Sequence, residues 1–118
     1  YPVEVDARPE FLTGCTRLKA GTSQKLILNM ISTISMIGIG KVYKNLMVDV
    51  QPTNSKLVER SKRIIMEATN CDYETAQKSL EIGGDVKTAI VMILTGSSKE
   101  EAKQKLENNK GFIRQAIR

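Results

Sequence analysis

The longest apolar run of the chain, from Leu26 to Ile37, predicts one long helix. Its few interruptions are uncharged polar residues, so a helix over about 23–39 would be apolar on most of its sides. A helix of that kind is buried, either in a core or in a subunit interface. Gly38 and Gly40 follow the run and should end the helix.

The residues before this helix predict a short strand and then a polar loop. Val3 and Val5 alternate with acidic residues, which is typical of a strand with one buried face, here over about 2–7. Residues 13–22 follow, with two glycines, three threonines, one arginine and one lysine. A strand, a loop and a long helix form the end of an α/β unit, in which ligands bind beyond the carboxyl ends of the strands. This placement makes the loop the candidate binding site.

The second half of the chain predicts a bundle of short amphipathic helices. An apolar, partly extended connection over 41–54 leads into it. Each helix follows a residue that can cap a helix N-terminus, and each has one apolar face. The helices are expected over 55–69 after Asn54 or Ser55, 73–82 after Asp72, and 86–94 after Asp85. Gly83 and Gly84 should end the second of them.

A weak internal repeat covers the last part of the chain. An acidic residue, an alanine, a leucine and a second acidic residue recur at the same spacing, as Glu74, Ala76, Leu80 and Glu81 and again as Glu100, Ala102, Leu106 and Glu107. An alanine–isoleucine pair follows in each copy, at 89–90 and at 116–117. Each copy therefore predicts two short helices joined by a turn that contains glycine.

Composition argues against several function classes. The chain has no His, which removes Ser-His-Asp and Cys-His catalysis within it, and no metal-ligand spacing is present, so we expect neither a metal nor a cofactor. The net charge of +5 suits an anionic partner, but aromatic residues are only 4% and the cations are scattered, so nucleic acid is not expected. No apolar stretch has the length of a membrane span. Cys15 and Cys71 should be free thiols in a reducing compartment.

The loop over 13–22 has the chemistry of an anion site. Backbone N–H groups at a helix N-terminus lack partners, and the helix dipole favours negative charge there. Thr22 or Ser23 could cap the helix, and Gly21 would let a ligand approach the backbone closely. On the residues alone, a capped helix start with two solvated cations is the alternative.

The loop and the residues after it resemble one enzyme family. The segments TRLKAGTSQK at 16–25, NM at 29–30, GKVY at 40–43 and NLMVDV at 45–50 are similar to the C-terminal part of N-acetylmuramic acid 6-phosphate etherases. Cys15 stands where a serine is usual in this family, and Lys44 stands where a glycine is usual. The glucokinase regulatory protein has the same architecture and is the related alternative.

The resemblance implies a mostly α chain in two parts. Residues 1–50 would be the C-terminal end of an α/β sugar isomerase-type domain, with the short strand, the loop and the long buried helix. Residues 51–118 would be a small helical bundle that resembles a ubiquitin-associated domain, which implies a fold and not ubiquitin binding. We expect this bundle to be a structural cap.

The resemblance also implies an activity. The full-length chain would be a cytoplasmic, homodimeric lyase of cell-wall sugar recycling. It would cleave the D-lactyl ether of N-acetylmuramic acid 6-phosphate and give N-acetylglucosamine 6-phosphate and D-lactate. The alternative is a non-catalytic phosphosugar-binding regulatory module similar to the glucokinase regulatory protein.

The site residues that the resemblance implies belong to substrate binding. The part of the phosphosugar pocket's wall that comes late in the domain's sequence would consist of Thr16, Arg17, Lys19, Gly21 and Thr22. No catalytic residue is carried over, because the acid and base glutamates of the family would lie upstream of Tyr1. We therefore expect the chain to be a fragment that is inactive by itself.

Overall fold

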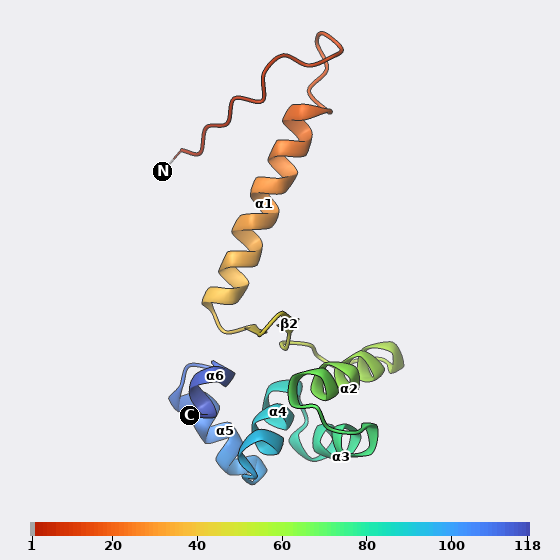
Figure 1. The fold of residues 1–118 in the computed structure, drawn as a ribbon, viewed down its shortest axis with the longest axis vertical. Helices are drawn as coiled ribbons and strands as arrows, with labels where there is room; N and C mark the ends of the chain where they lie inside the picture. The colour runs from red at the N-terminus through yellow and green to blue at the C-terminus, as the bar shows by residue number, and fades with distance from the viewer. Residues whose placement is uncertain (1) are drawn as a thin grey trace. The chain divides into compact units, whose positions relative to one another are not determined.

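The computed structural model describes residues 2–118, which are mostly helical (Figure 1). The elements in chain order are α1 (Lys19–Gly38), β1 (Val42–Tyr43), β2 (Leu46–Met47), α2 (Ser55–Thr69), α3 (Tyr73–Gly83), α4 (Val86–Thr95), α5 (Lys99–Asn108) and α6 (Ile113–Ala116). The chain separates into two compact units, an N-terminal unit up to Ser35 and a helical unit from Met36 onward. The division into a sugar isomerase-type part over 1–50 and a bundle over 51–118 stays a prediction.

The N-terminal unit begins with an extended segment that has no regular element before α1. The predicted strand over 2–7 is therefore wrong. Val3 and Val5 are 66% and 55% exposed, although their spacing suits a half-buried strand. A strand is stable only where a neighbouring strand accepts and donates its backbone hydrogen bonds. No neighbouring strand lies within residues 2–35.

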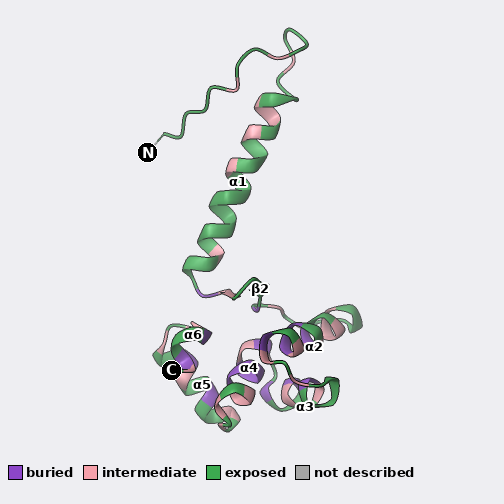
Figure 2. Ribbon diagram, in the orientation of Figure 1, coloured by how far each residue is buried: buried purple, intermediate pink, exposed green. Residues whose placement is uncertain are grey.

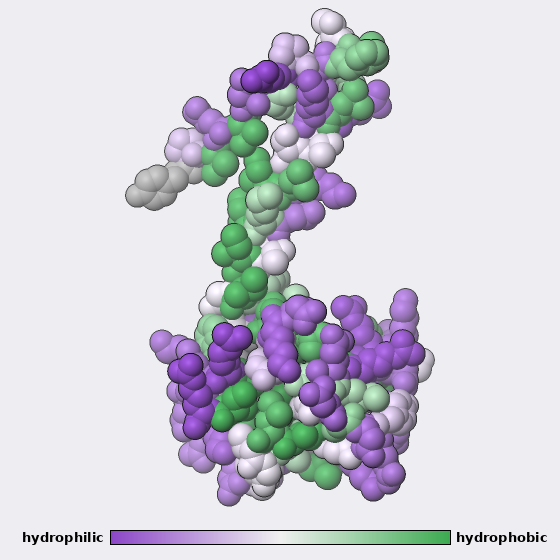
Figure 3. Space-filling model, viewed as in Figure 1, coloured by the Kyte–Doolittle hydropathy of each residue, from purple (hydrophilic) through white to green (hydrophobic). Residues whose placement is uncertain are grey.

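Helix α1 is long, apolar and exposed. It ends at Gly38, as predicted, but it begins at Lys19, four residues earlier than the apolar pattern indicates. None of its residues is buried (Figure 2), so the predicted burial of this helix is wrong for the chain in hand. Apolar side chains are visible along the length of α1 (Figure 3). Ile34, one of the apolar residues of this helix, is 68% exposed.

The connection after α1 is packed and partly extended, as predicted, and it closes into a small hairpin. Strands β1 and β2 pair antiparallel, with Val42 opposite Met47. Leu46 and Val48 are buried in the core of the helical unit. Gly40 has a φ of +74°, and a Cβ there would lie 3.2 Å from the carbonyl oxygen of Gly111. Glycine is therefore required at position 40 both by the backbone conformation and by the close approach of that chain segment.

The three helices that follow are confirmed, together with their caps. The side chains of Asn54, Asp72 and Asp85 each accept a hydrogen bond from the backbone N–H three residues later, at the starts of α2, α3 and α4. These helices turn their apolar faces to one core, in which Ile65 and Ile90 are fully buried. Local caps and one apolar face per helix thus account for this part of the fold.

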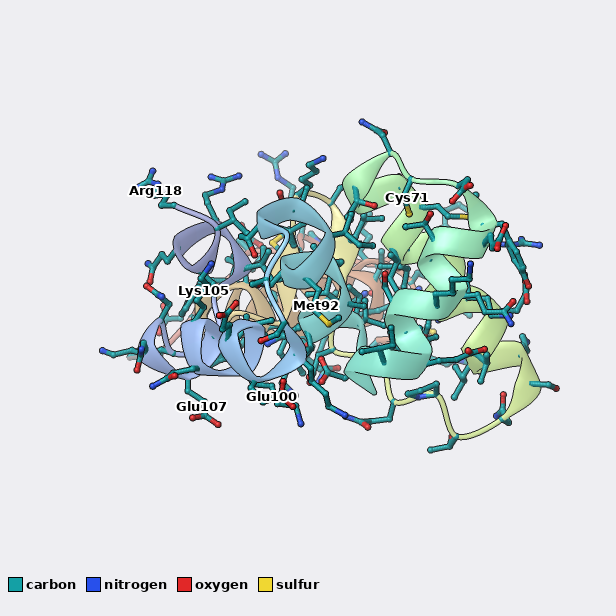
Figure 4. All side chains as sticks on the ribbon, turned by 90° about the horizontal axis from the view of Figure 1, so that it is seen from below. Cys71, Met92, Glu100, Lys105, Glu107 and Arg118 are labelled. Atoms are coloured by element: carbon teal, nitrogen blue, oxygen red, sulfur yellow. The ribbon has the colours of Figure 1, made fainter. Side chains whose placement is uncertain are left out.

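The internal repeat is visible in the packing. Both copies bury the alanine and leucine of the first helix and the alanine of the second: Ala76, Leu80 and Ala89 in α3 and α4, and Ala102, Leu106 and Ala116 in α5 and α6. The acidic positions of both copies are exposed, and Figure 4 shows Glu100 and Glu107 on α5. The two turns each contain a glycine with positive φ, Gly84 at +86° and Gly111 at +78°.

Candidate functional site

The predicted wall residues lie at the loop-to-helix junction of the N-terminal unit. Thr16 and Arg17 are in the loop, Lys19 is the first residue of α1, and Gly21 and Thr22 are in its first turn. All of them except Gly21 are exposed. Arg17 and Lys19, the two cations of the motif, therefore present their charges to solvent.

The structure brings two of the five wall residues into direct contact. The N–H of Gly21 donates to the carbonyl oxygen of Thr16 at 2.9 Å, and a Cβ on Gly21 would lie 3.3 Å from that oxygen. The glycine thus allows the loop backbone to approach the helix. The sequence predicted that Gly21 admits a ligand, whereas in the structure the protein itself fills the space.

The N-terminus of α1 is bound by a carboxylate from outside the helix. Glu10 accepts hydrogen bonds from the backbone N–H groups of Lys19 and Ala20, at 3.0 and 2.9 Å. The next N–H groups, of Gly21 and Thr22, donate to the carbonyl oxygens of Thr16 and Leu18. The N–H groups of residues 19–22 all have partners, so the expected bare anion site on the backbone is wrong.

Glu10 also replaces the predicted cap. Thr22 and Ser23 lie inside α1 and do not precede it. The N–H of Ala20 and then that of Lys19 are the main causes that lower the pKa of the Glu10 carboxyl, and the Lys19 ammonium adds to them. Sequence reasoning missed Glu10 because it stands nine residues before the helix, outside any local capping spacing.

The side chains of Lys19 and Arg17 keep their binding capacity. The ammonium of Lys19 donates to the carbonyl oxygen of Pro9 at 3.1 Å, and its remaining N–H donors stay available. Within residues 2–118, neither cation belongs to an ion pair. A lysine and an arginine two positions apart, both exposed, can hold a phosphate or a carboxylate through charge-assisted hydrogen bonds.

A shallow hollow of about 510 Å³ lies beside this junction. Its walls include two of the predicted residues, Lys19 and Thr22, together with Ala7, Leu18 and Ser23. The hollow therefore combines two apolar side chains, two hydroxyl groups and one cation.

Three further findings concern the described residues as a whole. Cys15 and Cys71 are free thiols. Within residues 2–118, no group of three or more acidic or cysteine side chains gathers as metal ligands would. Among these residues, no helix is at once long enough and apolar enough to cross a membrane.

Comparison with known proteins shows which enzymes the chain is similar to. No family model matches the chain. The chain is 72% identical over 98% of its length to N-acetylmuramic acid 6-phosphate etherase 2 of Enterococcus faecalis. It is 63% identical to the enzyme of the same name from Lactiplantibacillus plantarum, and 67% identical to the etherase of Shouchella clausii, again over 98% of the chain. By sequence, the chain matches a segment of N-acetylmuramic acid 6-phosphate etherases.

The chain spans about 40% of the length of these curated relatives. The resemblance seen in the loop and the hairpin is thus confirmed, and it includes the helical unit as well. The greater part of each relative has no counterpart in the chain.

Proposed function

We propose that the etherase segment acts as part of a carbon–oxygen lyase. The enzyme removes D-lactate from N-acetylmuramic acid 6-phosphate and gives N-acetylglucosamine 6-phosphate in the recycling of cell-wall sugars. The observation on which this rests is the 72% identity to a named etherase over 98% of the chain. A regulatory module similar to the glucokinase regulatory protein would bind the phosphosugar without releasing D-lactate, so an activity assay separates the two.

The loop-to-helix junction contributes the part of the phosphosugar pocket's wall that comes late in the domain's sequence. The planar guanidinium of Arg17 donates a pair of hydrogen bonds to phosphate or carboxylate oxygens, and the Lys19 ammonium acts as a point charge beside it. Thr16 and Thr22 add hydroxyl groups, and Gly21 lets the loop close onto the helix. The side chains do the binding, since the N–H groups of residues 19–22 are already engaged.

The exposed apolar side chains of α1 belong to an interface of the whole enzyme. Soluble proteins rarely leave apolar surface of this extent in water. We place the rest of a sugar isomerase-type domain and the second subunit of a homodimer against α1. The helices α2–α4 are a ubiquitin-associated-like structural cap, and the free thiols Cys15 and Cys71 fit a cytoplasmic enzyme.

The proposal is tested in an etherase of the relatives' full length that contains this segment, here called the full-length etherase. Arg17→Ala should lower kcat/KM for D-lactate release by roughly tenfold to a hundredfold, because a charge-assisted hydrogen bond to phosphate is lost. Arg17→Lys should recover only part of the loss, since the paired donors are missing. Arg63→Ala is the control, because Arg63 is an equally exposed arginine on α2.

Two outcomes would contradict the proposal. Unchanged kcat and KM in Arg17→Ala would reduce the loop to a helix start with solvated cations. Phosphosugar binding by the full-length etherase without any D-lactate release would favour the regulatory module. The 118-residue chain alone should release no D-lactate, because no catalytic acid or base is assigned within it.

A further inference from the structure

The carboxylate of Glu10 joins the two ends of the candidate loop. Glu10 belongs to the extended segment just before residues 11–18. Its carboxylate accepts hydrogen bonds from the N–H groups of Lys19 and Ala20, just after those residues. On the same side, the Lys19 ammonium donates to the carbonyl oxygen of Pro9, the residue next to Glu10. Both the backbone and the side chain of Lys19 are therefore tied to residues 9–10, which fixes where its charge lies.

We propose that Glu10 is a positioning residue for substrate, which places the Lys19 ammonium for the phosphate of the sugar. This inference rests on the function proposed above. Glu10 itself does not touch the substrate. It holds the loop closed between residues 11 and 18, so that the Lys19 ammonium stands at a fixed place on the wall.

Glu10 has a second effect on the same site. An unoccupied helix N-terminus would attract the substrate phosphate to the backbone. Because Glu10 occupies the N–H groups of Lys19 and Ala20, the phosphate is directed to the side chains instead. The neutral Pro9 carbonyl is a weaker acceptor for the ammonium than a phosphate oxygen, so Lys19 can exchange one for the other when substrate arrives.

A residue that only caps α1 and a residue that positions Lys19 are distinguished by whether the effect of removing Glu10 on KM depends on Lys19. If Glu10 only stabilises α1, its removal should change KM whether or not Lys19 has a charge. If Glu10 positions Lys19, its removal should change KM only while the ammonium is present. A double-mutant cycle between the two residues therefore distinguishes the roles.

The cycle is measured in the full-length etherase with Glu10→Gln, Lys19→Met and the double variant. Glu10→Gln keeps the side-chain size but removes the charge and one acceptor oxygen. It should raise KM for N-acetylmuramic acid 6-phosphate about tenfold, with kcat within about twofold, because ground-state phosphate binding is weakened. Glu10→Asp retains the charge and should recover part of the KM. In the Lys19→Met background, Glu10→Gln should change KM by less than about twofold.

Glu4→Gln is the matched control, since Glu4 is an exposed carboxylate of the same extended segment. A tenfold rise in KM from Glu10→Gln that persists at full size in the Lys19→Met background would overturn the positioning role. So would a normal KM in Glu10→Gln while Lys19→Met raises KM, and in that case the proposed phosphosugar wall stands without Glu10. If neither variant changes KM, the wall and the positioning role both fail.

Discussion

The two units of the chain both have apolar helix surfaces, but the burial of these surfaces is opposite. In α1, Leu26 and Ile34 are 50% and 68% exposed, whereas Ile65 and Ile90 of the helical unit are fully buried. The helical unit contains the partners of its own apolar faces within residues 36–118. The partners of α1 are not among the described residues. An apolar pattern thus identifies the residues that need a cover, but it does not say which molecule or segment provides it.

The two units also differ in how the N-termini of their helices are capped. In the helical unit, α2, α3 and α4 are capped by residues directly before them. In the N-terminal unit, α1 is capped by Glu10 from across a loop. One unit is therefore organised by neighbours in sequence, and the other by a contact that depends on the loop conformation.

The largest expected effect is on stability, and it tests the difference in burial between α1 and the helical unit. Ile90→Ala should lower the free energy of unfolding of the 118-residue chain by about 2–5 kcal/mol, because it leaves a cavity in the core. Ile34→Ala in α1 should change it by less than about 0.5 kcal/mol, since Ile34 is mostly exposed. Urea denaturation followed by circular dichroism measures both. Equal losses for the two variants would show that α1 is packed in the isolated chain.

Features of the fold that depend on residues close in sequence were predictable, whereas features that depend on a distant partner were not. Asp72 and Asp85 are readable as caps because their partners lie three residues away. The strand expected at Val3 and Val5, and the burial expected for α1, both depend on surfaces that residues 2–118 do not supply. Glu10 was missed because a cap from a distant segment has no sequence spacing to reveal it.

The residues of the candidate site were proposed from the sequence, but its geometry was not. Arg17 and Lys19 were proposed because the whole motif around them resembles a family, and both are exposed in the structure. The sequence could not indicate that the backbone N–H groups beside them are occupied. Nor could it indicate that Gly21 is needed for the carbonyl oxygen of Thr16.

A smaller, local effect concerns how the first turn of α1 depends on pH. The pKa of Glu10 is lowered by the N–H groups of Ala20 and Lys19, with the Lys19 ammonium as the facing charge. A carboxylate with a lowered folded pKa contributes stability above its unfolded pKa, about 4.3 for glutamate, and that stability is lost as pH falls through the folded value. The first turn of α1 should therefore stay intact at pH 4.3 and open only at lower pH.

The amide resonance of Ala20 in the 118-residue chain reports this opening directly. Its pH titration should have a midpoint below the ordinary glutamate pKa, and it should disappear in Glu10→Gln. A midpoint at or above the ordinary value would mean that the carboxylate does not bind the helix N-terminus in solution. The pKa of Asp72 is also lowered, first by the side chain of Thr75 and then by its backbone N–H, so Asp72 provides the reference titration in the helical unit, through the amide of Thr75.

The central claim is that the helical unit is complete within this chain, whereas α1 is completed by the rest of the etherase. Hydrogen exchange of the backbone amides, compared between the dilute 118-residue chain and the full-length etherase, tests it most directly. We predict slow exchange of α2–α4 in both proteins, and fast exchange of the middle of α1 in the short chain that becomes slow in the full-length etherase. Equal exchange of α1 in the two proteins, whether fast or slow, would contradict the claim.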